Sequence, residues 1–254
     1  MKRLIFVLFV ALFLCPFPLY ASSSPSSFSF VVFGDTEGGA TIFNDLITRI
    51  NREPNLAFCV GLGDFVSSAS EQSYKNYLGT IKKLKPKLYQ VVGNHDVYKG
   101  GYSLFNQYFG DSYYSFNYGN SHFVVLDNAL SKSFNARQFA WLKADLANSA
   151  KENIFVFMHK PIFDPTELYA GTTFSAKKTT EELLDVFKRY QVKYVFTGHV
   201  HGYIRTVRDG TVYIGTGGGG SPLHLPREFG GFYHCVRIDV RGSKINDNIL
   251  MLYE

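Results

Sequence analysis

Acidic, amide and imidazole side chains follow five short apolar runs of the sequence, in most cases next to glycine. The runs, with the polar residues after them, are 28–33 with Asp35 and Glu37, 56–60 with Asp64, 88–92 with Asn94, His95 and Asp96, 154–158 with His159, and 194–196 with His199 and His201. One aspartate after a strand is commonly a helix cap, and one histidine is commonly structural. Because the pattern recurs after every run, it predicts a single site that the runs build together.

The donors in this set are oxygen and imidazole nitrogen, with no cysteine thiolate among them. Such donors suit Mn, Fe, Zn or Ni rather than an iron–sulfur cluster or a cysteine-based zinc site. They outnumber the ligands of one tetrahedral ion, so two metal ions that share a carboxylate are the economical arrangement. Two such ions lower the pKa of a bridging water and hold a phosphoryl oxygen, and His95 beside Asp96 fits a proton donor oriented by a carboxylate.

The five apolar runs are nearly continuous and rich in β-branched and aromatic residues, as is typical of strands buried on both faces. Amphipathic segments between them predict helices, the third capped by Asn135 and the last by its Thr-Thr-Glu-Glu start; they cover 41–50, 72–84, 135–146 and 180–190. Strands alternating with helices form right-handed crossovers in a largely parallel sheet. The carboxyl ends of such strands meet at one edge, where ligands bind.

Other segments predict antiparallel pairing. Residues 113–118 and 122–127 flank Gly119-Asn120, a hairpin turn signal, and the chain from residue 203 onward consists of strand candidates at 203–207, 211–214, 232–239 and 244–252. An α/β body with such a second part predicts two packed sheets with helices outside. Because the candidate ligands run from Asp35 to His201, we expect one domain.

The N-terminus has the pattern of a secretory signal peptide. Lys2 and Arg3 precede an uncharged stretch that ends in Pro16, Pro18 and a run of small residues, which predicts a signal peptide at 1–21 and a Ser/Pro linker at 22–27. The alternative is an uncleaved anchor, but a spanning helix needs roughly 20 apolar residues and the prolines come too early. We therefore expect a secreted or periplasmic protein without a stable membrane span after cleavage.

The composition excludes other classes of protein. Of the 254 residues, 46% are hydrophobic, 17% aromatic and 19% charged, which excludes a disordered or coiled-coil chain. The net charge of +5 is mild and no Lys/Arg cluster stands out, which argues against nucleic acid as the main partner. After signal cleavage the cysteines are Cys59 and Cys235, which could pair or remain buried thiols.

The series Asp35, Gly63-Asp64, Gly93-Asn94-His95-Asp96, His159 and Gly198-His199-Val200-His201 closely resembles the motifs of the calcineurin-like metallophosphoesterases. The resemblance covers residues 28–254. It implies an α/β fold, a four-layer α-β-β-α sandwich with two mixed central sheets. It also implies two divalent or trivalent metal ions and a small-molecule phosphate mono- or diester as substrate, hydrolysed by a metal-bridging hydroxide.

The resemblance further implies a role for each residue at a matching position. Asp64 would bridge the two metals, Asp35 and His201 would hold the first, and Asn94, His159 and His199 would hold the second. Asn94 and His95 would contact the substrate, and His95, held by Asp96, would protonate the leaving alkoxide.

Two positions depart from the family pattern. Glu37 stands where the family usually has histidine, and it could ligate a metal or hydrogen-bond to a bound water. Ser67 stands where the family often has aspartate, whereas purple acid phosphatases have a metal-bound tyrosine; this argues against the purple, tyrosinate-bound iron type.

Several readings stay open at this stage. The Glu37 departure allows a degenerate member that binds phosphate or another ligand without turnover, and a nuclease is a further alternative that the lack of a basic patch disfavours. Segments 97–109 and 163–176 are the expected specificity loops, and the aromatic clusters 98–109 and 113–118 could line a pocket or pack in the core. Gly217–Gly220, Lys160 and Arg205 are weaker candidates for lining the site, and nothing in the sequence indicates an oligomeric state.

Overall fold

A computed structural model describes residues 25–164, 173 and 177–253. The predicted signal peptide and half of the predicted linker lie outside these residues, as does most of the predicted loop 163–176. The strands are β1 (Ser27–Phe33), β2 (Leu56–Gly61), β3 (Lys87–Gln90), β4 (Tyr114–Tyr118), β5 (Ser121–Val125), β6 (Asn153–Phe157), β7 (Tyr194–Thr197), β8 (Tyr203–Arg208), β9 (Thr211–Thr216), β10 (His234–Arg241) and β11 (Lys244–Met251). The helices are α1 (Ala40–Asn51), α2 (Glu71–Ile81), α3 (Asn94–Val97), α4 (Tyr102–Phe109), α5 (Ala136–Asn148) and α6 (Lys177–Arg189), with a 3₁₀ turn at Arg227–Phe229.

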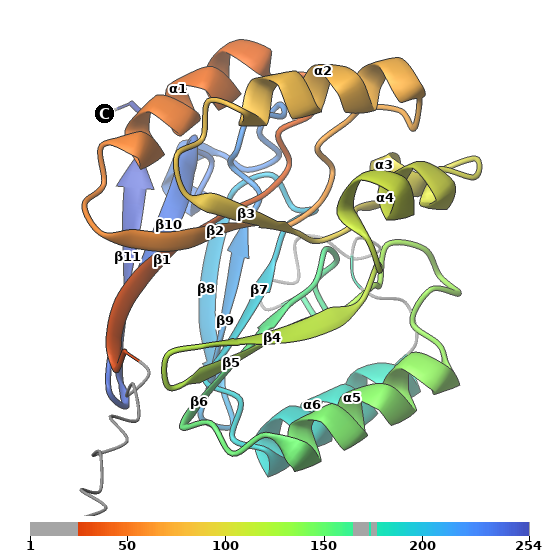
Figure 1. Cartoon of the computed structure of the whole chain (residues 1–254), viewed down its shortest axis with the longest axis vertical. Coiled ribbons are helices and arrows are strands. Elements are labelled where there is room, and N and C mark those ends of the chain that lie inside the picture. Colours follow the sequence, from red (N-terminus) through yellow and green to blue (C-terminus); the bar gives the residue numbers. More distant parts are fainter. Residues whose placement is uncertain (1–24, 165–172, 174–176, 254) are drawn as a thin grey trace, which may run out of the picture.

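The strands form two mixed sheets that face each other. One has the order β11-β10-β1-β2-β3 and the other β4-β5-β6-β7-β9-β8. Strands β1, β2 and β3 run parallel, as do β5, β6, β7 and β9, while the remaining pairings are antiparallel. Helices α1 and α2 cover the first sheet and α5 and α6 cover the second (Figure 1). The predicted four-layer α-β-β-α sandwich with two mixed central sheets is confirmed.

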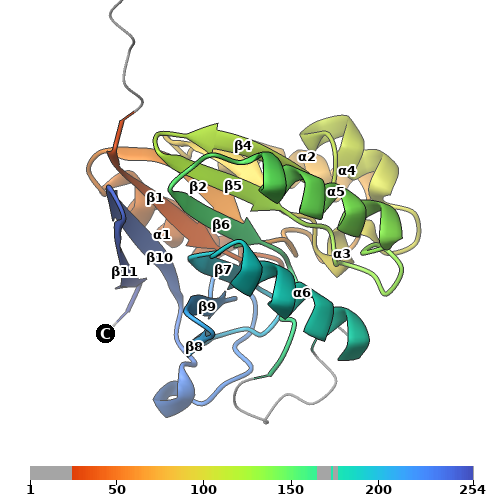
Figure 2. The same ribbon diagram turned by 90° about the horizontal axis from the view of Figure 1, so that it is seen from below.

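Three apolar layers hold the sandwich together. The layer between the sheets is dominated by phenylalanine: Phe30 of β1 stacks on Phe58 of β2 at a ring-centroid distance of 5.1 Å and meets Phe155 of β6 edge-on at 5.3 Å. The outer layers lie between each sheet and its helices, and Figure 2 shows α5 and α6 side by side over the second sheet. Strands that face apolar layers on both sides need the continuous apolar runs seen in the sequence.

The predicted elements exist, with some boundaries displaced. The hairpin turn at Gly119-Asn120 joins β4 to β5, and the Asn135 side chain caps α5 by accepting from the amides of Arg137 and Gln138. The predicted threonine cap of the last helix is wrong, because α6 begins at Lys177 and the Thr180 hydroxyl donates to the Ile162 carbonyl at 3.0 Å. Segment 97–109, expected as a loop, is largely helix α4.

Both described cysteines are free and buried. Cys59 lies on β2 and Cys235 on β10, and β1 runs between these strands. Two strand spacings amount to about 9–10 Å. This separation is too large for a disulfide, so the structure agrees with the buried-thiol alternative.

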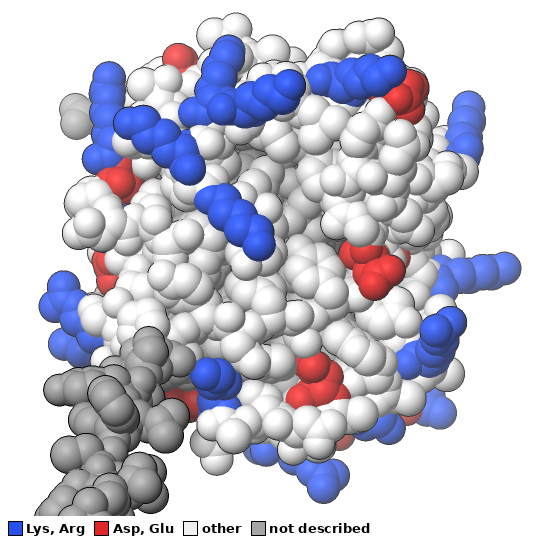
Figure 3. Space-filling model, in the orientation of Figure 1, with Lys and Arg blue, Asp and Glu red and all other residues white. Residues whose placement is uncertain are grey.

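Charged side chains are unevenly spread on the face shown in Figure 3. Lys and Arg gather along the edge formed by α1 and α2, whereas the part of this face around β4 shows few charged side chains. Among residues 25–164 and 177–253, every helix is too short or too polar to cross a bilayer.

The loop after β9 is fixed by a fully buried histidine, His234 of β10. Its backbone N–H donates to Gly218 O, its Nδ1 donates to Phe232 O at 2.9 Å, and its Nε2 lies 3.0 Å from the Thr216 hydroxyl. Burial lowers the pKa of His234 to about 4, because the charged imidazolium is poorly solvated there.

We predict that His234 makes the metal-free protein less stable as the pH falls from about 6.5 to about 4. In this window the unfolded state binds a proton that the folded state does not, so the free energy of unfolding changes by up to about 1.4 kcal/mol per pH unit. His234→Gln should remove this part of the slope, while lowering stability at pH 7. Urea unfolding in chelator across the pH range measures both, and equal slopes in the two proteins would contradict the prediction.

Candidate metal centre

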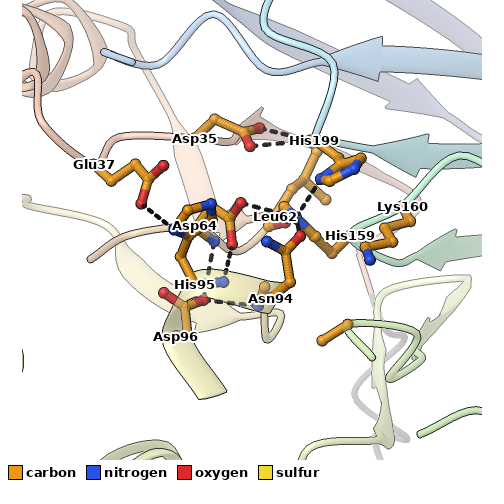
Figure 4. Close-up of polar contacts among 12 residues, drawn as sticks. Asp35, Glu37, Leu62, Asp64, Asn94, His95, Asp96, His159, Lys160 and His199 are labelled. Atoms are coloured by element: carbon orange, nitrogen blue, oxygen red, sulfur yellow. Dashed lines mark hydrogen bonds and ion pairs between the residues drawn. The ribbon is translucent and has the colours of Figure 1, made fainter. Parts of the chain in front are cut away.

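The residues singled out in the sequence converge at one edge of the sandwich (Figure 4). Strands β1, β2 and β3 of the first sheet and β6 and β7 of the second end at this edge, and the loop after each carries the donors. Both sheets therefore contribute, as expected for parallel strands whose carboxyl ends point the same way.

The backbone is left-handed at three of these strand ends. Asp35, Asp64 and His199 have φ of 59°, 48° and 67°, a region that residues other than glycine rarely adopt. Close packing around them leaves no room for a side chain at the neighbouring glycine. A Cβ added at Gly198 would lie 2.4 Å from Asp35 Oδ2. Strained backbone of this kind persists where the surroundings fix it, and it clusters at functional sites.

One tight group of donors consists of Asp64, His159 and His199, whose ligand atoms all lie within 4.8 Å of one another. His159 Nε2 is 3.1 Å from Asp64 Oδ2 and 3.2 Å from His199 Nδ1. Asn94 Oδ1 joins them at 3.0 Å from the same His159 nitrogen. These are the four residues expected to hold the second metal or to bridge, and the structure brings all of them together.

Hydrogen bonds to backbone carbonyls orient the rings of two of the expected ligands, His159 and His201. His159 Nδ1 donates to Leu62 O at 2.8 Å, and His201 Nδ1 donates to Pro222 O at 2.7 Å. In both rings Nε2 is thereby left to face the carboxylates. Such outer contacts are the usual way a protein sets the tautomer and direction of a ligating histidine.

Asp35 and His201, expected at the first metal, lie close to each other at 3.6 Å between Oδ1 and Nε2. Both Asp35 oxygens also accept from the backbone N–H of His199, at 3.0 and 2.9 Å. In the described part of the chain, this pair belongs to no three-ligand group as tight as the one around His159.

A second tight group of ligand atoms consists of Glu37, Asp64 and His95. Glu37 Oε2 is buried, accepts no hydrogen bond from a described residue, and lies 3.4 Å from His95 Nδ1. Burial, followed by repulsion from Asp64, raises the pKa of Glu37 to about 7. The residue that departs from the family pattern is thus inside the site.

The charges in the centre perturb one another strongly. Burial alone would raise the pKa of Asp64, but His159 lowers it to about 2, and burial alone would lower the pKa of His159, but Asp64 raises it to about 9. Burial and the neighbouring His159 lower the pKa of His199 to about 3. Perturbations of this size are typical of functional sites.

The donor set fits metal ions. Carboxylate, amide and imidazole atoms converge at the centre, and the buried Glu37 Oε2 accepts no hydrogen bond from a described residue. The two ligand groups that share Asp64 add one carboxylate and three imidazoles to it, a donor set that suits Mn, Fe, Zn or Ni.

The expectation that Asp96 holds the His95 ring is wrong. The buried carboxylate of Asp96 instead accepts four backbone N–H groups, from Asp64, Phe65, Val66 and Gly93, at 2.7 to 3.2 Å. The His95 ring faces Glu37 and the Ser67 carbonyl, 3.3 Å away. The reason is that neighbours on a helix point in different directions, and α3 begins at Asn94.

Two residues at the centre were not singled out from the sequence. The side chain of Asn128 accepts from the amides of His159 and Lys160 and donates to Lys160 O, which fixes the loop after β6. His224 stacks on His201 at a centroid distance of 3.8 Å, and its Nδ1 accepts from the His201 amide. Neither residue carries a local sequence signal, because both contacts are made across the fold.

Of the weaker candidates, Lys160 and Gly217–Gly220 lie at the centre and Arg205 does not. Lys160 lies beside His159 (Figure 4), and burial lowers the pKa of its ammonium. Gly217–Gly220 packs against the Asp35 loop, with the Gly219 amide donating to Gly34 O. Arg205 is not at the centre, because its guanidinium pairs with Asp247 of β11 through two bonds of 3.0 Å.

Fold and donor set together define an α/β sandwich with a candidate metal centre. The sequence model of the family described as calcineurin-like phosphoesterase matches residues 28–203. The chain belongs to the calcineurin-like phosphoesterase family.

Curated relatives include phosphodiesterases and phosphatases. A 3′,5′-cyclic-nucleotide phosphodiesterase of Nostoc sp. is 26% identical over 168 residues, or 64% of this chain and 62% of the relative. Purple acid phosphatase 15 of Arabidopsis thaliana is 32% identical over 162 residues, or 54% of this chain and 30% of the relative. The chain thus spans less than two thirds of the length of these two relatives.

Solved structures share the fold at low sequence identity. A purple acid phosphatase from yellow lupin has a TM-score of 0.73 and 16% identity, over 90% of this chain and 53% of that one. A dimetal phosphatase from Danio rerio has a TM-score of 0.65 and 17% identity, over 90% and 100%. Plasmodium GAP50, described as an anchor in the inner membrane complex, has a TM-score of 0.71 and 15% identity, over 91% and 86%.

We predict that Asp96→Asn destabilises the protein and loosens the centre. An amide keeps the shape of the carboxylate but turns an NH₂ group toward two of the four N–H donors. Because each bond to a charged acceptor contributes about 1.5–3 kcal/mol, the expected loss is about 3 kcal/mol, measured by urea unfolding in chelator.

The matched control is Glu71→Gln, which changes an exposed carboxylate on α2 whose partners are Tyr108 and Lys75. Its unfolding midpoint should stay close to that of the wild type. An Asp96→Asn protein as stable as this control would show that the four hydrogen bonds contribute little.

Proposed function

We propose that the protein is a dinuclear metal-dependent hydrolase of phosphate esters. The observation that carries the proposal is the pair of ligand groups that share Asp64. Membership of the calcineurin-like phosphoesterase family and relatives named as phosphodiesterases and phosphatases support it.

The proposed ligands follow from the positions of the donors. Asp64 would be shared, with Asn94, His159 and His199 at one ion and Asp35, His201 and Glu37 available to the other. Bound divalent ions supply positive charge to a phosphoryl oxygen and acidify water. Glu37 is included because its buried Oε2 has no hydrogen-bond donor among the described residues.

Residues of the chain would position the ester and move the proton. The Asn94 amide and the exposed His95 ring face the opening of the centre, where the phosphoryl group would sit. His95 would hold a proton on Nδ1 or Nε2 and deliver it to the departing alkoxide. Asp96, which had been expected to orient His95, would instead act as a positioning residue for the Asp64 loop, because its carboxylate accepts the Asp64 amide.

A ligand-binding protein without turnover is the second candidate. It is favoured by Glu37 at a position where the family usually has histidine, and the likeness to Plasmodium GAP50 is a reminder that this fold is also found in a protein described as an anchor. Metal content separates the two: two ions per chain favour catalysis, and one or none favours binding. We also propose a secreted or periplasmic location, from the signal peptide predicted at residues 1–21. This location is compatible with either candidate function.

We expect the purified protein to hydrolyse p-nitrophenyl phosphate, bis-p-nitrophenyl phosphate or both after addition of Mn or Zn. Chelator should abolish turnover, and readdition of metal should restore it. The initial rate of nitrophenolate release measures this, with metal content determined on the same sample. A protein with two bound ions and no activity on either ester would contradict the proposal.

We expect His95→Asn to slow hydrolysis of an alkyl phosphate by about 100-fold or more, because general acid catalysis contributes roughly 10²–10⁴. An alkyl ester is needed, since its alkoxide requires a proton whereas nitrophenolate leaves without one. Metal content should stay at two ions per chain, in contrast to His199→Asn, which should lose metal.

Glu37→Gln is the matched variant for this experiment, because Glu37 and His95 belong to the same ligand group. Loss of one ion from both Glu37→Gln and His95→Asn would identify His95 as a ligand and overturn its assignment as the acid. Full activity of His95→Asn would also overturn the assignment of His95 as the acid.

A further inference from the structure

A cavity of about 360 Å³ opens directly beside His95. Residues 67–69 of the loop after β2 line one side, and Tyr98 and Lys99, which follow α3, line the other; Asn94 and His95 connect it to the metal centre. We call it the Tyr98 cavity. Its size is that of a pocket for a small organic group rather than for phosphate alone.

Tyr98 presents an open ring to this cavity. Its side chain is 63% exposed, although large aromatic side chains are usually covered, and no ring pair among the described residues includes it. The Lys99 ammonium lies 5.8 Å from the centre of the ring and forms no ion pair with a described residue. The cavity therefore offers a free aromatic face with a cation next to it.

The backbone beneath this ring is held in place. The Tyr98 amide donates to Asn94 O at 3.0 Å, and the Gly101 amide donates to Val97 O at 3.0 Å. Gly101 has no space for a side chain, because a Cβ there would lie 2.4 Å from both Ala69 Cβ and Asp96 O. The Tyr74 hydroxyl also binds Asp96 O at 2.8 Å, so the backbone that carries the ring needs little ordering when a ligand stacks on it.

His95 gives the cavity its place in the reaction. In the proposed function this ring donates the proton to the leaving alkoxide, so the carbon skeleton on that oxygen lies beside His95, on the side away from the phosphorus. The Tyr98 cavity is the space that begins there, since His95 is one of its lining residues. The alcohol part of the ester, rather than the phosphate, is the group that would occupy it.

We propose that the Tyr98 cavity binds a planar aromatic group on the alcohol side of the substrate, stacked on Tyr98. The substrate class is thereby an ester of phosphate with an alcohol that carries an aromatic ring, as in an aryl-alkyl phosphate or a nucleotide. The proposal rests on the proposed function, because it takes His95 as the residue next to the leaving group.

The test compares 2-phenylethyl phosphate with 2-cyclohexylethyl phosphate, and the methyl diesters of the same two alcohols. The alcohols have nearly the same acidity and size, so the chemical step is the same and the rings differ in planarity and π-electrons. The wild type should prefer the phenyl ester by about tenfold in kcat/KM, because stacking on one aromatic side chain contributes roughly that factor. Tyr98→Ala should bring the ratio close to one, and Tyr98→Phe should keep it.

The control is Tyr253→Ala, which removes another exposed tyrosine, one that bonds to Asp45 of α1. It should keep the wild-type ratio. A wild-type ratio near one, or a tenfold ratio that survives Tyr98→Ala, would overturn the cavity assignment while leaving the hydrolase intact; Tyr98 would then be an exposed residue for some other contact.

Binding of 2-phenylethylphosphonate and 2-cyclohexylethylphosphonate separates this proposal from the proposed function, because neither compound can be hydrolysed. If no ester is turned over, the hydrolase proposal fails, and calorimetric titration still decides the cavity. A Tyr98-dependent preference for the phenyl compound supports the assignment, and equal affinities overturn it.

Discussion

The buried carboxylate of Asp96 is the contact on which the metal centre depends. Its two oxygens accept the N–H groups of residues 64–66 after β2 and of Gly93 after β3, and so tie two loops into one unit. Within that unit the left-handed backbone of Asp64 is stabilised, and Asp64 Oδ1 accepts the His95 amide at 2.8 Å. Because hydrogen bonds are stronger in a buried environment, this small network fixes the shared ligand before any ion is bound.

The fold and the location of the site could be predicted from the sequence, because continuous apolar runs followed by glycine and a polar residue report strand ends directly. Roles that depend on side-chain direction could not. His95 and Asp96 are adjacent in sequence, yet one faces the opening and the other faces the interior, since successive residues of α3 diverge. The contacts of Asn128 and His224 span more than twenty residues, and no local pattern encodes them.

Repulsion between neighbouring carboxylates also affects the energetics of the candidate centre. Asp64 and Asp35 both raise the pKa of Glu37, so three carboxylates are held close enough to repel. The folded protein carries this repulsion in a small buried volume, where bound cations would relieve it. Glu37, which stands where the family usually has histidine, adds a carboxylate to the ligand group that contains one imidazole, whereas the other group contains two.

The phenylalanine layer between the sheets has a consequence for the metal centre. Asp64 and Asn94 follow strands of the first sheet, whereas His159 and His199 follow strands of the second, so the distance between the two ligand pairs depends on how far apart the sheets lie at that edge. Ring contacts across the layer, Phe30 with Phe155 and Phe58 with Phe123, set this separation. The aromatic core thus acts as the spacer between the two sets of donor residues, whose separation depends on packing far from them as well as on the donors themselves.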